Sequence, residues 1–223
     1  MKLLSRSLMA VILSVLSFTV TAETFREGVD YKMLSTPVEV DNPKNIEVRE
    51  FFWFGCPHCF ALEAQLADWK KTMPEGVDFV ATPAPLNKAW KPHAHAFYIA
   101  EALGKLDEIG PALFDVIHVD KKRVTSQDQL AEFFTQYGVT EDEFNKLYNS
   151  FSVRVNVRKA EALAKTYRLT GVPAIIVNGK YLVENRTAKT NERMIEIVNF
   201  LIDKEKIRAA TLMPPADLKV KVN

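Results

Sequence analysis

The sequence predicts an α/β protein in which one sheet domain is interrupted by a block of helices. Strand-like segments at 46–54 and 77–82 precede this block, and strand-like segments at 173–177 and 181–183 follow it. Between them, apolar residues recur with helical spacing. Strands at both ends of the chain must pair across the block, so we expect one discontinuous sheet domain with a helical insertion.

The strand expected at 46–54 alternates at first and then becomes continuously apolar, which is typical of a strand covered on both faces. Gly55 interrupts it directly before two cysteines. From 57 to about 72 the pattern becomes helical, and Pro57 suits the first turn because its missing N–H would have no partner there. The apolar stripe of this helix consists of Cys59, Leu62, Leu66 and Trp69.

A series of helices is expected in the middle of the chain. They span 93–103, 107–119 and 153–167, and two others begin at the capping-box pairs Ser126 with Gln129 and Thr140 with Glu143. Gly138 is expected to end the helix that starts at Ser126. This block is the predicted insertion.

The last part of the chain returns to strands and then closes with a helix. Asn178-Gly179, between two apolar segments, is a strong hairpin signal. An amphipathic helix follows at 191–207, and an irregular tail is expected from Thr211 because Pro214-Pro215 cannot continue a helix. The predicted boundaries are a signal peptide at 1–22, a sheet domain at 23–85 and 161–210, the helical insertion at 86–160 and the tail at 211–223.

The first residues have the layout of a secretory signal peptide. Lys2 and Arg6 precede an apolar run at 8–20, and the small residues Thr21-Ala22 follow it. The run is shorter than the roughly 20 residues that span a bilayer, so we expect cleavage after Ala22 and export. An uncleaved membrane anchor is the alternative.

Composition narrows the class of protein. The formal net charge is +1 and the chain has no basic block, which argues against nucleic acid or a lipid surface as the main partner. With 48% hydrophobic residues the chain can bury a substantial core. It has only 2 cysteines. A bridge between residues so close in sequence closes a very small ring, so it is a poor structural staple and a better candidate for redox chemistry.

The motif Cys56-Pro57-His58-Cys59 lies where a strand gives way to a helix. Helix N-terminal N–H groups and the helix dipole favour an anion there, so Cys56 is expected to be the attacking thiolate. His58 can add a hydrogen bond or positive charge, and Pro57 sets the start of the helix beside the thiol. Cys59, one turn inward on the apolar stripe, is expected to be the less exposed resolving thiol.

Two other uses of a CxxC motif fit the sequence less well. A structural zinc site needs four ligands, and the chain has no second cysteine pair. Attachment of c-type haem needs histidine directly after the second cysteine, where this chain has Phe60. His93, His95 and His118 are read as surface or internally satisfied histidines, and no metal is expected.

Two segments resemble the DsbA family of bacterial periplasmic disulfide oxidases: Glu50-Phe-Phe-Trp-Phe-Gly-Cys-Pro-His-Cys59 and Thr170-Gly-Val-Pro-Ala-Ile-Ile-Val-Asn-Gly-Lys-Tyr181. The resemblance implies a thioredoxin fold with an inserted all-helical domain, and a periplasmic location. It also implies a cis Val172–Pro173 bond that faces the thiols, with Val172 and Pro173 contacting substrate. The residues alone would favour an ordinary turn before a strand.

Two acidic residues are further candidates for the site. Glu50 interrupts an otherwise apolar strand, and Glu63 lies one helical turn after Cys59. Either acid could accept or relay the proton of Cys59, and a solvent-facing carboxylate is the alternative for Glu63. Related proteins carry a lysine near these acids on the second strand, where 80–82 of this chain offers none.

The resemblance implies a monomeric oxidase that transfers its Cys56–Cys59 disulfide to newly exported, reduced proteins through a mixed disulfide. It implies reoxidation by a DsbB-like, quinone-linked membrane oxidase, and no cofactor besides the disulfide. A disulfide isomerase or reductase on the same fold is the nearest alternative. A binding or chaperone module with incidental cysteines is the alternative from another class.

Overall fold

The computed structural model describes residues 24–212 and contains a five-stranded sheet in the order β1-β5-β4-β2-β3. The strands are β1 (Lys32–Met33), β2 (Ile46–Phe52), β3 (Val77–Pro83), β4 (Ala174–Val177) and β5 (Tyr181–Glu184). The helices are α1 (Pro57–Lys71), the 3-10 turn η1 (Lys88–Trp90), α2 (Lys91–Ala102), α3 (Leu106–His118), α4 (Gln127–Thr135), α5 (Glu141–Tyr148), α6 (Phe151–Thr166), α7 (Asn185–Ala188) and α8 (Asn191–Leu212).

The sheet joins the two ends of the described chain, as expected. β2 pairs in parallel with β3 and antiparallel with β4, so strands from before and after the insertion are direct neighbours. β4 and β5 form the predicted hairpin, with Asn178 at φ 51° and Gly179 at φ 63°. Two positive φ values are what a two-residue hairpin turn matched to strand twist requires. The thioredoxin fold with a helical insertion is confirmed.

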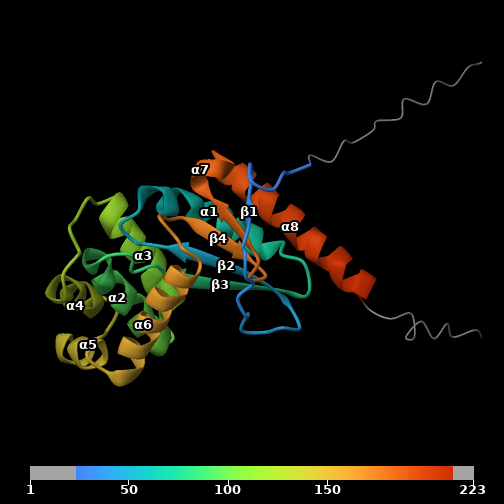
Figure 1. Cartoon of the computed structure of the whole chain (residues 1–223). Coiled ribbons are helices and arrows are strands. Elements are labelled where there is room, and N and C mark those ends of the chain that lie inside the picture. Colours follow the sequence, from blue (N-terminus) through green and yellow to red (C-terminus); the bar gives the residue numbers. More distant parts are fainter. Residues whose placement is uncertain (1–23, 213–223) are drawn as a thin grey trace, which may run out of the picture.

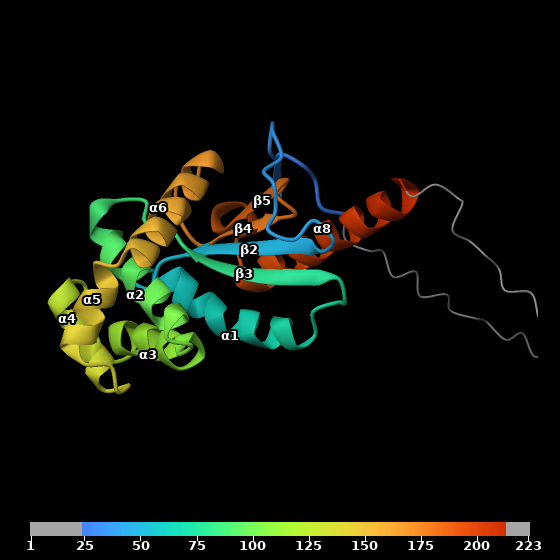
Figure 2. The same ribbon diagram turned by 90° about the horizontal axis from the view of Figure 1, so that it is seen from below.

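Helices cover both faces of the sheet, and the insertion packs at one end of it (Figures 1 and 2). On one face, Val48, Ile175 and Val183 contact the apolar sides of α1 and α8. On the other face, Phe51 and Ile176 pack with Tyr167 at the end of α6. This two-sided cover explains why β4 is apolar throughout and why β2 is buried almost throughout although it carries Glu47, Arg49 and Glu50.

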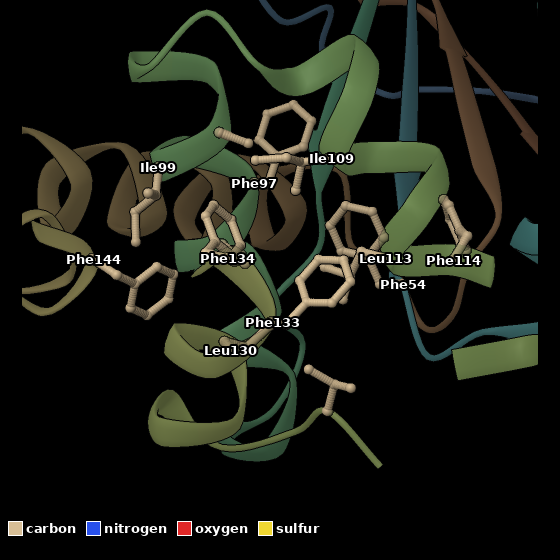
Figure 3. Packing of buried hydrophobic residues seen from close by; sticks show 14 of the residues in the cluster. Phe54, Phe97, Ile99, Ile109, Leu113, Phe114, Leu130, Phe133, Phe134 and Phe144 are labelled. Carbon is tan, nitrogen blue, oxygen red and sulfur yellow. The ribbon is translucent and has the colours of Figure 1, made fainter. Parts of the chain in front are cut away.

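The insertion has its own aromatic core (Figure 3). The core includes Phe97, Ile109, Leu113, Phe114, Leu130, Phe133, Phe134 and Phe144. Phe52, Phe54 and Cys59 belong to the same cluster. The insertion and the region around the cysteines are therefore packed as one body.

Several predicted boundaries differ from the structure. β2 ends at Phe52, because Phe54 lies in a turn closed by the Cys56 N–H donating to the Trp53 carbonyl at 2.9 Å. α8 runs to Leu212, so the prediction of irregular chain was wrong for 211 and 212. α6 passes through residue 160 without a break, which puts the predicted boundary of the insertion inside a helix. The predicted signal peptide and residues 213–223 lie outside the described residues.

The predicted helix starts are confirmed at their caps. Ser126 forms a complete capping box with Gln129, and the Thr140 hydroxyl accepts the Glu143 backbone N–H at 3.2 Å. Within residues 24–212, none of the helices is both long enough and apolar enough to cross a bilayer.

Gly179→Ala is expected to destabilise the protein more than Gly104→Ala. Both glycines have positive φ, 63° and 66°, which costs a residue with a Cβ about 1–2 kcal/mol. A Cβ at Gly104 meets nothing within 4 Å, whereas one at Gly179 would lie 2.0 Å from the Val38 carbonyl oxygen. We expect a loss of roughly 3 kcal/mol or more for Gly179→Ala, measured by denaturant unfolding. Equal losses would show that the Val38 contact relaxes freely.

Candidate active site

Cys56 is the N-cap residue of α1, with φ −90° and ψ 116°, and Pro57 begins the helix. The Cys56 sulfur accepts the backbone N–H of Cys59 at 3.4 Å. That N–H belongs to the first turn, where helical N–H groups have no partner within the helix. Cys56 is 7% exposed and Cys59 is fully buried, while His58 is exposed. The predicted difference in exposure between the two thiols is confirmed.

The surroundings of Cys56 lower its pKa to about 6. The largest cause is a hydrogen bond from the Cys59 thiol, and burial opposes it. Backbone N–H groups of Cys59 and His58 and the charge of His58 lower the pKa further. His58 thus acts on the thiolate mainly as part of the helix start, and Cys59 has a tuning effect that the sequence analysis did not assign to it.

Cys59 has the opposite environment. Burial is the main cause that raises its pKa, and the neighbouring Cys56 and Glu50 raise it further. At neutral pH the reduced pair therefore holds one thiolate, on Cys56, and one neutral thiol, on Cys59. Because of this asymmetry, Cys56 is the thiol that forms and breaks the bond to a partner sulfur, and Cys59 is the thiol that must gain or lose a proton.

The loop before β4 closes the site from the other side. Val172–Pro173 is a cis peptide, as the family resemblance implied. In its protonated form the Cys56 thiol donates to the Val172 carbonyl at 3.5 Å, which brings together residues more than a hundred positions apart. A cavity of about 270 Å³ adjoins this loop, lined by 170–173 and 184–186. Polar backbone at Val172 is thus presented next to the reactive sulfur.

Glu50 lies beneath the thiols, 1% exposed, and its Oε1 atom has no hydrogen-bond partner among the described residues. Burial raises the pKa of Glu50 well above its usual value; repulsion from Glu63 adds to the shift and attraction to Lys70 reduces it. Burial also raises the pKa of the half-buried Glu63, again opposed by Lys70. The two acids predicted from the sequence are therefore close enough to interact.

The sequence analysis missed Lys70. No lysine comes from the second strand, but Lys70 follows Glu63 by two turns of α1 and lies on the same side of that helix. Its Nζ sits 5.0 Å from the ring centroid of Phe79 on β3. The spacing of Lys70 from Glu63 along the helix was the signal available in the sequence.

A ring stack and a hydrogen bond connect the insertion to the residues before Cys56. The Trp53 and Trp90 rings stack at 4.4 Å between centroids with an interplanar angle of 5°. His118 Nε2 donates to the Phe54 carbonyl at 2.7 Å. His118 is thus one of the internally satisfied histidines that the sequence analysis allowed, and no pattern in the sequence links it to Phe54.

No group of three or more histidine, cysteine, aspartate or glutamate side chains that could hold a metal ion occurs in the part of the chain that the structure describes. The chemistry available from the described side chains is that of two thiols with very different pKa values.

Comparison with known proteins identifies the family. Residues 75–196 match the model of the DSBA-like thioredoxin domain. The thiol:disulfide interchange protein DsbA of Pseudomonas aeruginosa is 36% identical over 196 residues, which cover 88% of this chain and 93% of that protein. The chain belongs to the DsbA family. It is a protein disulfide oxidoreductase.

Other DsbA proteins give the same result. DsbA of Azotobacter vinelandii is 38% identical over 80% of this chain and 84% of its own length. The crystal structure of Pseudomonas aeruginosa DsbA superimposes with a TM-score of 0.79, covering 83% of this chain and 97% of that one at 36% identity. The oxidoreductase DsbA from Xylella fastidiosa gives 0.74 at 30% identity, covering 80% and 96%. DsbA proteins exchange disulfides through a cysteine pair, the chemistry for which this site is built.

The ultraviolet absorbance of the Cys56 thiolate should titrate in one step with a pKa of about 6 in the reduced protein. Cys59→Ala removes the main hydrogen bond to the sulfur and should raise that pKa by roughly 1–2 units. Cys59→Ser keeps a donor and should shift it less. An unchanged pKa in Cys59→Ala would contradict the assigned role of the Cys59 thiol.

Glu50→Gln should stabilise the reduced protein increasingly as the pH rises. A carboxyl group with a raised pKa in the folded state contributes stability below its unfolded pKa and loses it as the pH rises through the folded pKa. We therefore expect no gain near pH 4 and a growing gain above it, about 1.4 kcal/mol for each unit by which the pKa is raised. Urea unfolding from pH 4 to pH 8 measures this.

Glu161→Gln is the control with the opposite sign. Hydrogen bonds from Lys91 and Lys165 lower the pKa of Glu161, so its stabilising effect is present at neutral pH and lost as the pH falls. This variant should be less stable than the parent at pH 7 and equal to it in acid. If the stability of both variants changes with pH in the same direction, burial of the Glu50 charge is not the cause of the stability change in Glu50→Gln.

Proposed function

We propose that this protein introduces disulfide bonds into newly exported proteins by donating its Cys56–Cys59 disulfide. One observation carries the proposal: Cys56 has a pKa of about 6 at the helix start, where its sulfur accepts hydrogen bonds. Stabilising the thiolate stabilises the reduced pair, which makes the disulfide more oxidising. A pair with this property gives its disulfide to other thiols.

The reaction takes two thiol–disulfide exchanges. A substrate thiolate attacks the Cys56 sulfur, a bond forms between them, the Cys56–Cys59 bond breaks, and Cys59 leaves and takes up a proton. A second substrate thiolate then attacks the substrate sulfur of this mixed disulfide, and Cys56 leaves as a thiolate. The substrate is oxidised by two electrons, which reduce the Cys56–Cys59 pair.

The other site residues support these two steps. Glu50 and Glu63 supply the proton that the departing Cys59 needs, since burial raises the pKa of both carboxyl groups and Glu50 is close enough to raise the pKa of that thiol. The Val172 backbone, whose carbonyl faces the Cys56 sulfur, pairs with the substrate chain beside Pro173. Pro57 and His58 hold the helix start and its charge at Cys56. Backbone pairing suits substrates of varied sequence.

Export and reoxidation complete the cycle. The signal-like first residues and the family support a periplasmic monomer whose substrates are reduced exported proteins. Each turnover leaves a reduced pair, so a DsbB-like, quinone-linked membrane oxidase would accept its two electrons. The redox group is the Cys56–Cys59 disulfide itself, without a further cofactor.

The first test measures the equilibrium between the Cys56–Cys59 pair and glutathione. We expect the pair to stay reduced in buffers where thioredoxin-type pairs form disulfides, and the oxidised protein to oxidise a reduced, unfolded protein stoichiometrically. If the pair instead forms its disulfide as readily as that of a reductase, the protein reduces its partners, and the proposed direction of electron flow is wrong.

Two single-cysteine variants test the order of events. Cys56→Ser should lose all oxidase activity and form no mixed disulfide, because Cys59 is buried and its raised pKa leaves it unreactive. Cys59→Ser should also lose turnover, yet form a stable mixed disulfide with glutathione through Cys56, detected by mass spectrometry. Retained oxidase activity in Cys56→Ser would favour a binding or chaperone module with incidental cysteines.

A further inference from the structure

His118 connects the helical insertion to the turn that delivers Cys56. It lies in the last turn of α3, and its Nε2 atom donates to the Phe54 carbonyl at 2.7 Å. Its ring also stacks on Phe60, with centroids 4.9 Å apart and an interplanar angle of 12°. Phe54 and Phe60 flank the two cysteines, so one side chain of the insertion contacts the motif on both sides.

The Phe54 carbonyl belongs to the peptide of the turn that is most free to rotate. The Cys56 N–H donates to the Trp53 carbonyl at 2.9 Å, which closes a four-residue turn over 53–56. Its central peptide joins Phe54 to Gly55. In a turn of this kind, rotation of the central peptide interconverts the two common types, and the rotated form needs a residue that accepts positive φ at the third position.

Gly55 occupies that third position and would permit the rotated form. In the structure its φ is not positive, so the turn is in the form that does not depend on glycine. The glycine is needed for another reason, because a Cβ there would lie 2.3 Å from the Trp53 ring. The sequence thus allows two orientations of the peptide, and an interaction from outside the turn has to select one.

We propose that His118 is a positioning residue for the active-site thiols, holding the peptide between Phe54 and Gly55 in the orientation that places Cys56 at the start of α1. A carbonyl oxygen can only accept, so the imidazole donates from Nε2. Phe54 is 2% exposed and packs against Phe114 of the same helix at 4.9 Å between centroids, close by in Figure 3. A rotated carbonyl would lose its imidazole donor in a region that offers little water.

The proposal gives the insertion a chemical role in addition to covering the site. Releasing the peptide would let Cys56 move relative to the N–H group of Cys59 that its sulfur accepts at 3.4 Å. A weaker hydrogen bond to the thiolate makes the thiolate less stable and the disulfide less oxidising. This inference rests on the proposed function of Cys56 as the attacking thiolate.

Two substitutions separate the hydrogen bond from the stacking. His118→Phe keeps an aromatic ring over Phe60 and loses the donor, whereas His118→Gln keeps a donor near the Nε2 position and loses the ring. We expect His118→Phe to raise the Cys56 pKa by about half a unit or more and to shift the glutathione equilibrium roughly threefold toward the disulfide. His118→Gln should stay close to the parent in both measurements.

His95→Phe is the matched control. His95 is also on a helix of the insertion, its Nδ1 bonds the Tyr148 carbonyl at 3.1 Å, and its ring stacks on Tyr148 at 4.0 Å. Its loss should lower thermal stability without moving the Cys56 pKa.

The outcomes are distinct. If the Cys56 pKa is low in the parent and equally low in His118→Phe, the positioning role is overturned. It is also overturned if His95→Phe shifts the Cys56 pKa as much as His118→Phe does. A near-normal Cys56 pKa in the parent overturns the proposed function instead. If His118→Phe does not fold, His118→Gln becomes the test. Because this variant keeps a donor, a Cys56 pKa raised in it by half a unit or more overturns the positioning role.

Discussion

At the start of α1, the Cys59 N–H points at the Cys56 sulfur from 3.4 Å, because the first-turn N–H groups of a helix have no partner within it. The chemistry of the protein depends on this helix start, where the Cys59 thiol donates a second and stronger hydrogen bond to the same sulfur. It stabilises negative charge on one thiol, while burial of Cys59 prevents the same charge on the other. A reactive and an unreactive thiol can therefore lie one helical turn apart.

β2 carries charged residues on both faces of the sheet, and the two faces differ in the hydrogen-bond partners that they offer to these residues. Arg49 is buried on one face, where Glu47 accepts from its Nε at 2.7 Å and Thr82 from its Nη1 at 2.9 Å. Glu50, the next residue, points to the side of α1, and its Oε1 has no such partner among the described residues. A satisfied buried ion pair contributes structure, whereas an unsatisfied carboxyl group with a raised pKa is suited to proton transfer.

The inserted helices pack beside the active site and also contact the residues that form it. Phe52 and Phe54 of the sheet domain and Phe97 and Phe114 of the insertion share one core, so the two parts cannot pack independently. The Trp53–Trp90 stack and the His118 hydrogen bond then reach Trp53 and Phe54, shortly before Cys56. Packing of the insertion is in this way coupled to the geometry of the thiols.

The sequence by itself determined the order of elements, the hairpin at Asn178-Gly179, the helix caps and the position of Cys56 at a helix start. These follow from local rules, since periodicity, turn residues and caps act within a few positions along the chain. The roles of Lys70 and His118 were decided by tertiary structure. The electrostatic effect of Lys70 on Glu50 and the hydrogen bond of His118 to Phe54 act between elements, where spacing along one helix gives no information. For the same reason, only the folded chain brings Val172 to Cys56.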